Sequence, residues 1–377
     1  MKLFLKDKTF DFHVDAPPSK SVYHRELIIR FLLGYEDDLM PSPEDSKDII
    51  ATKNCLLALR EKKTILDCNE SGSTLRFMIP VAAAYAKVNN ISGKLVFTTK
   101  GRLYDRPIDA LEKCLATHNV KIVRNDNERT FELQGNLTEG EFVIDGSASS
   151  QYVSGLMMAL TILPQSTLTV TGKPTSVHYI KLTENILNKY KLDDKQNLQG
   201  FNIEGDWSGG AFLLCLSELI HGHVEVGNLN KDSVQGDKEI LKFLDKLGAE
   251  ELSWDCENIP DIVPYMAVTA AFRNKKTVFN NIGRLRIKES DRVAAIREQL
   301  QVAGIRTEET EDTLTVCGYE NNYNSDTIEL KSYNDHRMVM SAILIAAALE
   351  CDLIIDSIDP VDKSFPGLRD VIREEFS

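Results

Sequence analysis

Ser71-Gly72-Ser73-Thr74 leads directly into the apolar run from Leu75 to Ala86. Small and hydroxyl-bearing residues favour the first turn of a helix, because their side chains accept hydrogen bonds from backbone N–H groups that lack a partner there. Apart from Arg76 the run is uncharged, which is typical of a helix buried on nearly all sides. The stretch therefore predicts a capped helix inside a protein core.

The same kind of segment occurs six times along the chain. The six helix starts, each with its apolar run, are Pro18-Ser19-Lys20-Ser21 before Arg25 to Leu33, Ser71-Gly72-Ser73-Thr74 before Leu75 to Ala86, Gly146-Ser147-Ala148-Ser149-Ser150 before Val153 to Leu163, Gly205-Asp206-Trp207-Ser208 before Ala211 to Ile220, Ile259-Pro260-Asp261 before Val263 to Phe272, and Tyr333-Asn334-Asp335 before His336 to Leu349. One such segment alone is common in any α/β protein. The last three starts, however, follow the first three by 189 residues (19 to 208), 189 residues (72 to 261) and 186 residues (149 to 335). The second half of the chain therefore repeats the first, with three similar units in each half.

Short runs rich in β-branched and apolar residues lie between these helices and predict strands. They are Lys94 to Thr99, Glu141 to Ile144, Thr167 to Val170, His223 to Val226, Thr277 to Asn280 and Leu353 to Ile355. A second, amphipathic helix usually follows the strand, as at Ile108 to Leu115 and Lys238 to Leu247. We interpret the pattern as an α/β fold built from βαβαββ units. Methionines within the apolar runs, Met338 and Met340 among them, are interpreted as packing residues.

Composition excludes several classes of protein. The 377 residues are 42% hydrophobic and 27% charged, which suits about two globular domains. With 44 Lys+Arg against 57 Asp+Glu, the net charge of -13 argues against general binding to nucleic acid or to an anionic membrane. Apolar runs fall short of the roughly 20 residues that span a bilayer, and the first residues carry no secretory signal. Seven scattered cysteines without a Cys-x-x-Cys spacing predict a reduced, cytoplasmic protein with no zinc site.

Basic residues are placed at the helix starts or in the turns beside them. They are Lys20, Arg25, Arg76, Arg106, Lys288, Arg292, Arg337 and Lys363. A helix N-terminus offers unpaired N–H donors and the positive end of the helix dipole, so it binds phosphate or carboxylate. Taken alone, any one of these cations would be interpreted as a solvated surface charge. Together they predict the capture of an anionic ligand.

Two further positions carry candidate acid–base groups. In the run from Arg286 to Arg292, Lys288, Glu289 and Arg292 are spaced to present a cation, a carboxylate and a second cation to one ligand. Asp261 follows Pro260 at a helix start, where a simple cap is one interpretation. The other is a carboxylate that accepts a hydroxyl proton from a ligand.

The chain resembles the 5-enolpyruvylshikimate-3-phosphate synthase family, whose members are enolpyruvyl transferases of the shikimate pathway. Motifs that carry the resemblance follow the family's order: Pro18-Ser19-Lys20-Ser21 with Arg25, Gly72-Ser73 with Arg76, Arg106-Pro107-Ile108, Ser149-Ser150-Gln151, Gln235-Gly236-Asp237, Ile259-Pro260-Asp261, Lys288-Glu289-Ser290-Asp291-Arg292, Tyr333-Asn334-Asp335-His336-Arg337-Met338 and Lys363-Ser364-Phe365-Pro366.

The resemblance implies a two-domain enolpyruvyl transferase fold, with three βαβαββ repeats around a pseudo-threefold axis in each domain and a cleft between the domains. The expected domains are residues 18–205 and residues 1–17 plus 206–377. The implied reaction transfers the enolpyruvyl group of phosphoenolpyruvate to the 5-hydroxyl of shikimate 3-phosphate and releases phosphate, on the route to chorismate and aromatic amino acids. The resemblance also implies a monomer that needs no metal or organic cofactor and is a target of glyphosate.

Site residues are carried over position by position from the resemblance. Residues expected at shikimate 3-phosphate are Lys20, Ser21, Arg25, Ser149, Ser150, Gln151, Ser176, Tyr179, Asp261 and Lys288. Those expected at phosphoenolpyruvate are Lys20, Gly72, Arg106, Gln151, Arg292, Arg337 and Lys363. The expected catalytic residues are Asp261, Glu289, Lys20 and Lys363, with Asp261 accepting the 5-hydroxyl proton and Glu289 with Lys20 handling the proton at the methylene carbon.

Some positions depart from the family pattern. Glu70 and Arg284 replace the residue types usual there, and the loop from Thr98 to Tyr104 lacks the usual Gly-Asp pair. Two other functions remain as alternatives. One is the sister enzyme that transfers enolpyruvyl to UDP-N-acetylglucosamine, although the loop before Arg106 lacks that enzyme's cysteine. The other is a non-catalytic protein that binds phosphate or RNA ends, which the acidic composition disfavours.

Overall fold

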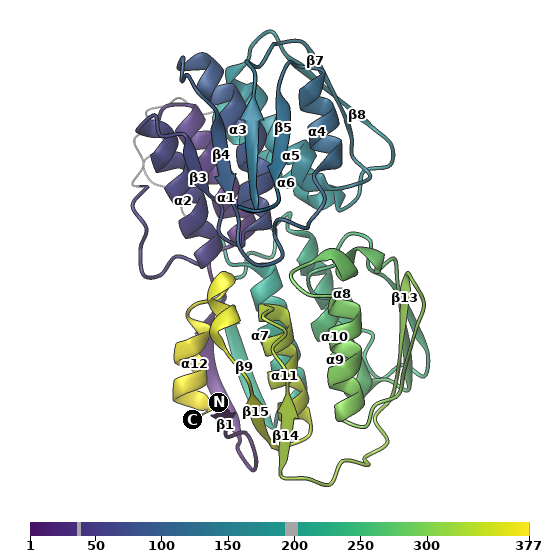
Figure 1. Ribbon diagram of the computed structural model, residues 1–377. Helices are drawn as coiled ribbons and strands as arrows, with labels where there is room; N and C mark the ends of the chain where they lie inside the picture. Colours follow the sequence, from purple (N-terminus) through teal and green to yellow (C-terminus); the bar gives the residue numbers. More distant parts are fainter. Residues whose placement is uncertain (36–38, 193–202, 377) are drawn as a thin grey trace. The chain divides into compact units, whose positions relative to one another are not determined.

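The computed structural model describes residues 1–35, 39–192 and 203–376. The chain divides into two compact units, which we call the terminal unit (Met1–Ser19 with Glu204–Ser377) and the inserted unit (Lys20–Ile203). Both chain ends belong to the terminal unit, where the backbone N–H of Phe4 donates to the carbonyl of Phe376 at 2.7 Å (Figure 1). Within the described ranges, no helix has both the length and the apolar character that a membrane crossing requires.

Three helices form the centre of the inserted unit, and each contacts the other two. They are α1 (Lys20–Leu32), α3 (Gly72–Val88) and α5 (Ser150–Ala159). The hydroxyls of Ser71 and Ser149 cap α3 and α5, accepting from the backbone N–H groups of Thr74 and Gln151. Every residue of α3 from Thr74 to Ala84 is buried, so the prediction of a capped core helix is confirmed.

The remaining elements of the inserted unit surround these helices. The helices are α2 (Lys47–Arg60), α4 (Asp109–Ala116), α6 (Val177–Leu192) and the 3-10 turn η1 (Leu160–Ile162). The strands are β3 (Ile65–Asp67), β4 (Leu95–Thr98), β5 (Lys121–Asn125), β6 (Thr130–Gln134), β7 (Glu141–Asp145) and β8 (Thr167–Thr171).

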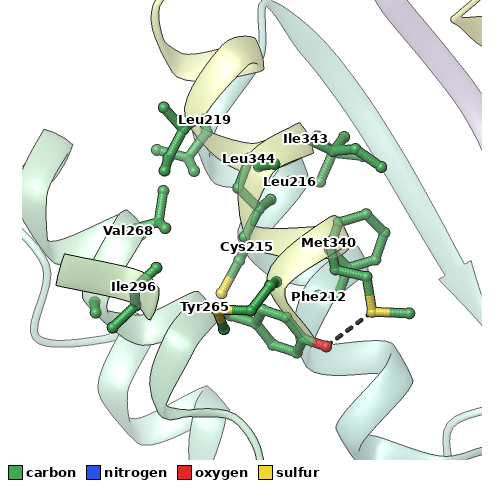
Figure 2. Packing of buried hydrophobic residues seen from close by; sticks show 14 of the residues in the cluster. Phe212, Cys215, Leu216, Leu219, Tyr265, Val268, Ile296, Met340, Ile343 and Leu344 are labelled. Atoms are coloured by element: carbon green, nitrogen blue, oxygen red, sulfur yellow. Dashed lines mark hydrogen bonds between the residues drawn. The ribbon is translucent and has the colours of Figure 1, made fainter. Parts of the chain in front are cut away.

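The terminal unit has the same centre, built from three mutually contacting helices. They are α7 (Trp207–Leu219), α9 (Val263–Arg273) and α11 (His336–Ala348). Figure 2 shows their apolar side chains packed together, with the hydroxyl of Tyr265 donating to the sulfur of Met340 at 2.8 Å. Met338 and Met340 are fully buried in this core, which confirms that they are packing residues.

Other elements of the terminal unit lie around that core. The helices are α8 (Ile240–Leu244), α10 (Arg292–Val302), α12 (Leu368–Glu375) and the 3-10 turns η2 (Gly236–Glu239), η3 (Gly283–Ile287) and η4 (Asp359–Lys363). The strands are β1 (Lys2–Leu3), β2 (Phe10–Asp15), β9 (Gly222–Gly227), β10 (Leu252–Asp255), β11 (Lys276–Asn280), β12 (Thr307–Glu309), β13 (Thr313–Cys317), β14 (Thr327–Leu330) and β15 (Asp352–Ile355).

Strand pairing repeats between the two units, as the offsets in the sequence predict. The inserted unit has a four-stranded sheet in the order β3-β4-β6-β5, and the terminal unit has one in the order β10-β11-β13-β12. In both sheets the first pair is parallel and the other two pairs are antiparallel. With α3 and α4 in one unit and α9 and α10 in the other, each sheet completes a βαβαββ unit. The parallel pairs β7–β8 and β14–β15 flank α5 and α11 in the same way, as shorter repeats.

The N-terminal strands pair within the terminal unit, β1 with β15 and β2 with β9. The two segments that lead into and out of the inserted unit also lie side by side. Pro18 and Gly205 form an isolated bridge, and the N–H of Ser19 donates to the carbonyl of Glu204 at 2.8 Å. The N–H of Gly205 also donates to the carbonyl of Asn228 at 3.0 Å. A side chain on Gly205 would collide with that carbonyl, so the close approach to Asn228 requires glycine.

Candidate active site

The starts of α3 and α5 hold a cluster of cationic and amide side chains in the inserted unit. Gln151 accepts a hydrogen bond from the Arg76 guanidinium at 2.9 Å and donates to the hydroxyl of Ser73 at 2.9 Å. Arg106 comes from the loop between β4 and α4, and its guanidinium lies against Gly72. The structure thus brings together Gly72, Arg106 and Gln151 with Arg76, which the sequence analysis placed among the basic residues at helix starts.

Position 72 is a glycine because there is no room for a side chain there. Its φ is not positive, and it lies in the first turn of α3, so backbone conformation does not require glycine there. A Cβ at this position would meet the guanidinium carbon of Arg106 at 2.9 Å and a guanidinium nitrogen of Arg76 at 3.0 Å. The missing side chain therefore lets two arginines approach the same helix N-terminus, which favours an anion.

Arg25 is buried beside these helix starts, in α1. Its guanidinium donates to the hydroxyls of Thr183 (2.7 Å) and Ser154 (3.2 Å), and to the carbonyls of Ser21 (2.7 Å) and Tyr179 (3.2 Å). Burial, only partly offset by Tyr179, lowers the pKa of Arg25 to about 10. Ser21 and Tyr179, both predicted site residues, are thus gathered around a guanidinium that keeps its positive charge at neutral pH.

The other predicted site residues of the inserted unit lie at the starts of its helices. Ser149 caps α5, while Ser150 and Ser176 are buried at the starts of α5 and α6. Lys20 forms a 2.8 Å ion pair with Asp48 at the start of α2, a helix that the sequence interpretation did not include.

In the terminal unit, Asp261 lies between two cations. One of its carboxylate oxygens is 3.2 Å from the Lys288 ammonium and 2.8 Å from the Arg292 guanidinium. The residue at the N-cap of α9 is Ile262, with no side-chain capping bond, so Asp261 does not cap the helix. Pro264 in the first turn already lacks the N–H that a cap would satisfy. The capping interpretation is therefore wrong.

Arg292 is the centre of this cluster. Its side chain is 1% exposed and contacts three carboxylates: Asp335 at 2.8 Å, Asp261 at 2.8 Å and Glu289 at 2.7 Å. Asp335 is fully buried, caps α11 through the N–H of Arg337 and also accepts from the hydroxyl of Ser290. Lys288, Glu289, Arg292 and Asp261 are thus brought together, as the sequence predicts, but around an ion pair between Arg292 and Asp335 that the sequence did not reveal.

Charge in the cluster sets the protonation of Asp261 and Lys288. Burial raises the pKa of Asp261, but Lys288, Arg292 and Arg337 outweigh burial and hold that pKa well below its ordinary value. Burial lowers the pKa of Lys288 to about 8, although Asp261 opposes the change. Asp261 is therefore ionised across the physiological range, and Lys288 loses half of its protons near pH 8.

Arg337 and Lys363 lie at the start of α11 and in η4. The Arg337 guanidinium donates to the Tyr265 hydroxyl at 2.9 Å and to the carbonyl of Ser208 at 3.3 Å. Lys363 donates to the carbonyl of Asn334 at 2.8 Å, one residue before Asp335. The core residue Tyr265 thus orients a predicted ligand-binding arginine.

Glu70 and Arg284, which depart from the family pattern, both lie close to predicted site residues or to the loops that carry them. Glu70 packs against Gly101, whose positive φ of 57° shapes the loop before Arg106. Arg284 is in η3 and is close enough to Lys288 to help lower its pKa.

Asp237, in η2, is a titratable residue to which the sequence interpretation gave no role. Burial and the negative charge of Asp261 raise its pKa to about 7, although Arg337 opposes the change. The sequence carried one signal for Asp237, because it is an acidic residue directly after a glycine in the Gln235-Gly236-Asp237 motif.

We predict that Asp237→Asn stabilises the protein at pH 8 and gives no advantage at pH 4. Because the folded state raises this pKa from 3.8 to about 7, it binds more protons than the unfolded chain between these values, so wild-type stability falls as pH rises through this window. Asn cannot ionise and avoids the loss, which amounts to at most about 4 kcal/mol. Urea unfolding at pH 4, 6 and 8 measures the difference. A gain that is equal at all three pH values would contradict the assignment.

The comparisons with known proteins agree on one family. A family model described as EPSP synthase (3-phosphoshikimate 1-carboxyvinyltransferase) matches residues 41–254 and 250–372. The 3-phosphoshikimate 1-carboxyvinyltransferase of Clostridioides difficile (strain 630) is 31% identical over 412 aligned positions, covering 94% of this chain and 92% of the relative. That of Clostridium beijerinckii is 30% identical, covering 95% and 93%.

Solved structures show the same fold. An EPSP synthase from Acinetobacter baumannii superposes with a TM-score of 0.69 at 18% identity, covering all of this chain and 98% of that one. The enolpyruvyl transferase NikO from Streptomyces tendae gives a TM-score of 0.66 at 12% identity, covering 100% and 97%. Since the family model matches most of the chain and the relatives match nearly all of it, the chain belongs to the EPSP synthase (3-phosphoshikimate 1-carboxyvinyltransferase) family.

Proposed function

We propose that the protein transfers the enolpyruvyl group of phosphoenolpyruvate to the 5-hydroxyl of shikimate 3-phosphate and releases phosphate, as a 3-phosphoshikimate 1-carboxyvinyltransferase of the shikimate pathway. The observation that carries this proposal is the ionised Asp261 between Lys288 and Arg292, with Glu289 on the same arginine. It supplies a base, a second carboxylate and two cations, which this transfer needs. Membership of the family supports the same reaction.

The test is phosphate release from phosphoenolpyruvate. We expect release that depends on shikimate 3-phosphate and is absent with UDP-N-acetylglucosamine. Release with the nucleotide sugar alone would assign the sister reaction. Binding of both substrates without any release would favour a non-catalytic protein.

We assign substrate contacts as the motifs predict. For shikimate 3-phosphate they are Lys20, Ser21, Arg25, Ser149, Ser150, Gln151, Ser176, Tyr179, Asp261 and Lys288. For phosphoenolpyruvate they are Lys20, Gly72, Arg106, Gln151, Arg292, Arg337 and Lys363. Two observations support these assignments: Arg25 is buried with no carboxylate partner in the part of the chain that the structure describes, and two arginines lie against Gly72.

The proposed chemistry is an addition followed by an elimination. Asp261 takes the 5-hydroxyl proton as the oxygen bonds to the central carbon of phosphoenolpyruvate, while Glu289 with Lys20 delivers a proton to the methylene carbon. In the elimination, Glu289 with Lys20 takes back a proton from the new methyl group, the double bond re-forms, and the bond to phosphate breaks as phosphate leaves. Lys363 and the arginines offset the negative charge of both substrates.

Arg292 links substrate binding to the basicity of Asp261 in this scheme. While Arg292 and Lys288 both contact Asp261, its low pKa makes it a weak base. An anionic substrate that draws the Arg292 guanidinium toward itself weakens one of these contacts and raises the pKa of Asp261. The base is then strengthened only when substrate is bound.

Three broader features belong to the same proposal. The domains are residues 18–205 and residues 1–17 plus 206–377, each built from three repeats. The protein acts as a monomer, which light scattering at assay concentration would test. It works in the cytoplasm, a location supported by free thiols at all seven cysteines, six of them buried.

We predict that Gly72→Ala raises the KM for phosphoenolpyruvate by about tenfold, with a change in melting temperature of less than about 3 °C. The added methyl displaces the flexible ends of Arg106 and Arg76, while alanine itself suits a helix. Steady-state kinetics and thermal melting measure the two effects. Gly367→Ala is the matched control, because its Cβ would meet only Phe365, at 3.8 Å. An unchanged KM would show that this loop does not bind phosphoenolpyruvate.

A further inference from the structure

Arg25 and Arg292 are equally buried arginines with opposite surroundings. The Arg292 side chain contacts three carboxylates. Arg25 is 2% exposed, and no carboxylate within the described ranges forms an ion pair with it. An uncompensated buried charge is costly, so its retention indicates that a negative group from outside the chain supplies the balance.

Neutral oxygen atoms hold the Arg25 guanidinium in one orientation. A guanidinium has five N–H donors. Thr183 accepts from Nε, Ser154 and the Tyr179 carbonyl from Nη2, and the Ser21 carbonyl from Nη1. That accounts for four donors and leaves one N–H on Nη1, with no acceptor in the part of the chain that the structure describes. The ring of Phe77 lies 5.0 Å from the guanidinium carbon and limits rotation further.

Thr183 is the member of this group that sets the plane of the guanidinium, because Nε has a single N–H and Thr183 accepts it. Its hydroxyl is 2.8 Å from that of Ser154 and 2.9 Å from the Tyr179 carbonyl, and both hydroxyl-bearing residues are fully buried. With Thr183 donating to Ser154, and Ser154 donating to the Tyr179 carbonyl at 3.4 Å, both hydroxyls direct their lone pairs toward Arg25. Two helices, α5 and α6, thereby orient a cation of a third, α1.

We propose that Thr183 and Ser154 are positioning residues, which hold the Arg25 guanidinium so that its remaining N–H and its charge face an anionic group of the acceptor substrate. The inference rests on the proposed function, in which Arg25 binds shikimate 3-phosphate. Neither hydroxyl touches substrate in this scheme. Both act through Arg25.

The simpler interpretation is structural, since buried threonines in helices often donate to the carbonyl four residues earlier. Thr269 in α9 is such a residue: it is fully buried and donates to the Tyr265 carbonyl at 2.9 Å. It contacts no arginine in the hydrogen bonds of the described residues, so Thr269→Val is the matched control for Thr183→Val.

The test compares Thr183→Val with Thr183→Ser and the Thr269→Val control. Valine keeps the shape of threonine but leaves the Nε–H of Arg25 buried without an acceptor. We expect Thr183→Val to raise the KM for shikimate 3-phosphate by about tenfold, with kcat and the KM for phosphoenolpyruvate changed less than about twofold. Thr183→Ser retains the hydroxyl and should restore the wild-type KM. Thr269→Val should alter neither KM.

A second cycle separates positioning from packing. In an Arg25→Met background, adding Thr183→Val should change the KM by less than about twofold, because the group it orients is gone. A tenfold effect that persists without Arg25, or a parallel rise in both KM values, would overturn the proposal. So would an unchanged KM in Thr183→Val. If Thr183→Val does not fold, Ser154→Ala takes its place in the cycle, with an expected rise of about threefold from the loss of one Nη2 contact.

The two hypotheses fail differently. Wild-type protein that releases no phosphate with shikimate 3-phosphate contradicts the proposed function. If wild-type protein is active and Thr183→Val has the same KM for shikimate 3-phosphate, only the positioning role is contradicted.

Discussion

Replacing Asp261 with Asn is expected to lower kcat by roughly 100-fold or more, which is the usual contribution of a general base. Asparagine keeps the size of the side chain and accepts a hydrogen bond from Lys288 or Arg292, but it cannot take a proton from the 5-hydroxyl. Affinity for shikimate 3-phosphate should change less than about threefold, because most of the contacts assigned to this substrate lie in the inserted unit. Steady-state kinetics and a binding titration measure the two quantities.

The control for this variant is Asp291→Asn. Asp291 caps α10 by accepting from the N–H of Ala294, and asparagine caps equally well, so this variant should keep nearly normal turnover. Normal turnover in Asp261→Asn would show that Asp261 is not the base. Loss of affinity without loss of kcat would assign it to binding instead.

Arg25→Met and Arg292→Met are expected to have opposite effects on stability. Methionine in place of Arg25 removes a buried charge that has no carboxylate partner among the described residues, and Thr183, Ser154 and the Tyr179 carbonyl still satisfy one another. The melting temperature should therefore stay the same or rise. The KM for shikimate 3-phosphate should rise by about 100-fold, since a charge-assisted contact with an anionic group of the substrate is lost.

Arg292→Met removes the partner of three carboxylates, of which Asp335 is fully buried. Leaving buried charges without a partner costs about 3–5 kcal/mol, so this variant should melt well below wild type. Denaturant unfolding of both variants measures the contrast. A large destabilisation by Arg25→Met would mean that Arg25 serves the fold rather than a ligand.

Local residue pattern was sufficient to predict most of the architecture. The helix starts at Ser71 and Ser149, the six core helices and the repeat offsets follow from capping chemistry and hydrophobic periodicity, which act over a few residues. The helices α2, α6 and α12 were missed, α2 despite a local signal: it begins after Ser46, whose hydroxyl accepts from the N–H of Ile49. With α2, the Asp48 partner of Lys20 was missed as well.

The sequence by itself determined which residues gather at helix starts, because a polar turn before an apolar run is a local property of the chain. Only the tertiary structure decided what each charged group faces. The three carboxylates on Arg292 and the hydroxyls on Arg25 come from segments up to 43 and 158 residues away along the chain. Buried charges respond to atoms within a few ångströms regardless of sequence separation. The ionised state of Asp261 and the uncompensated charge of Arg25 therefore depend on the folded arrangement of the helices.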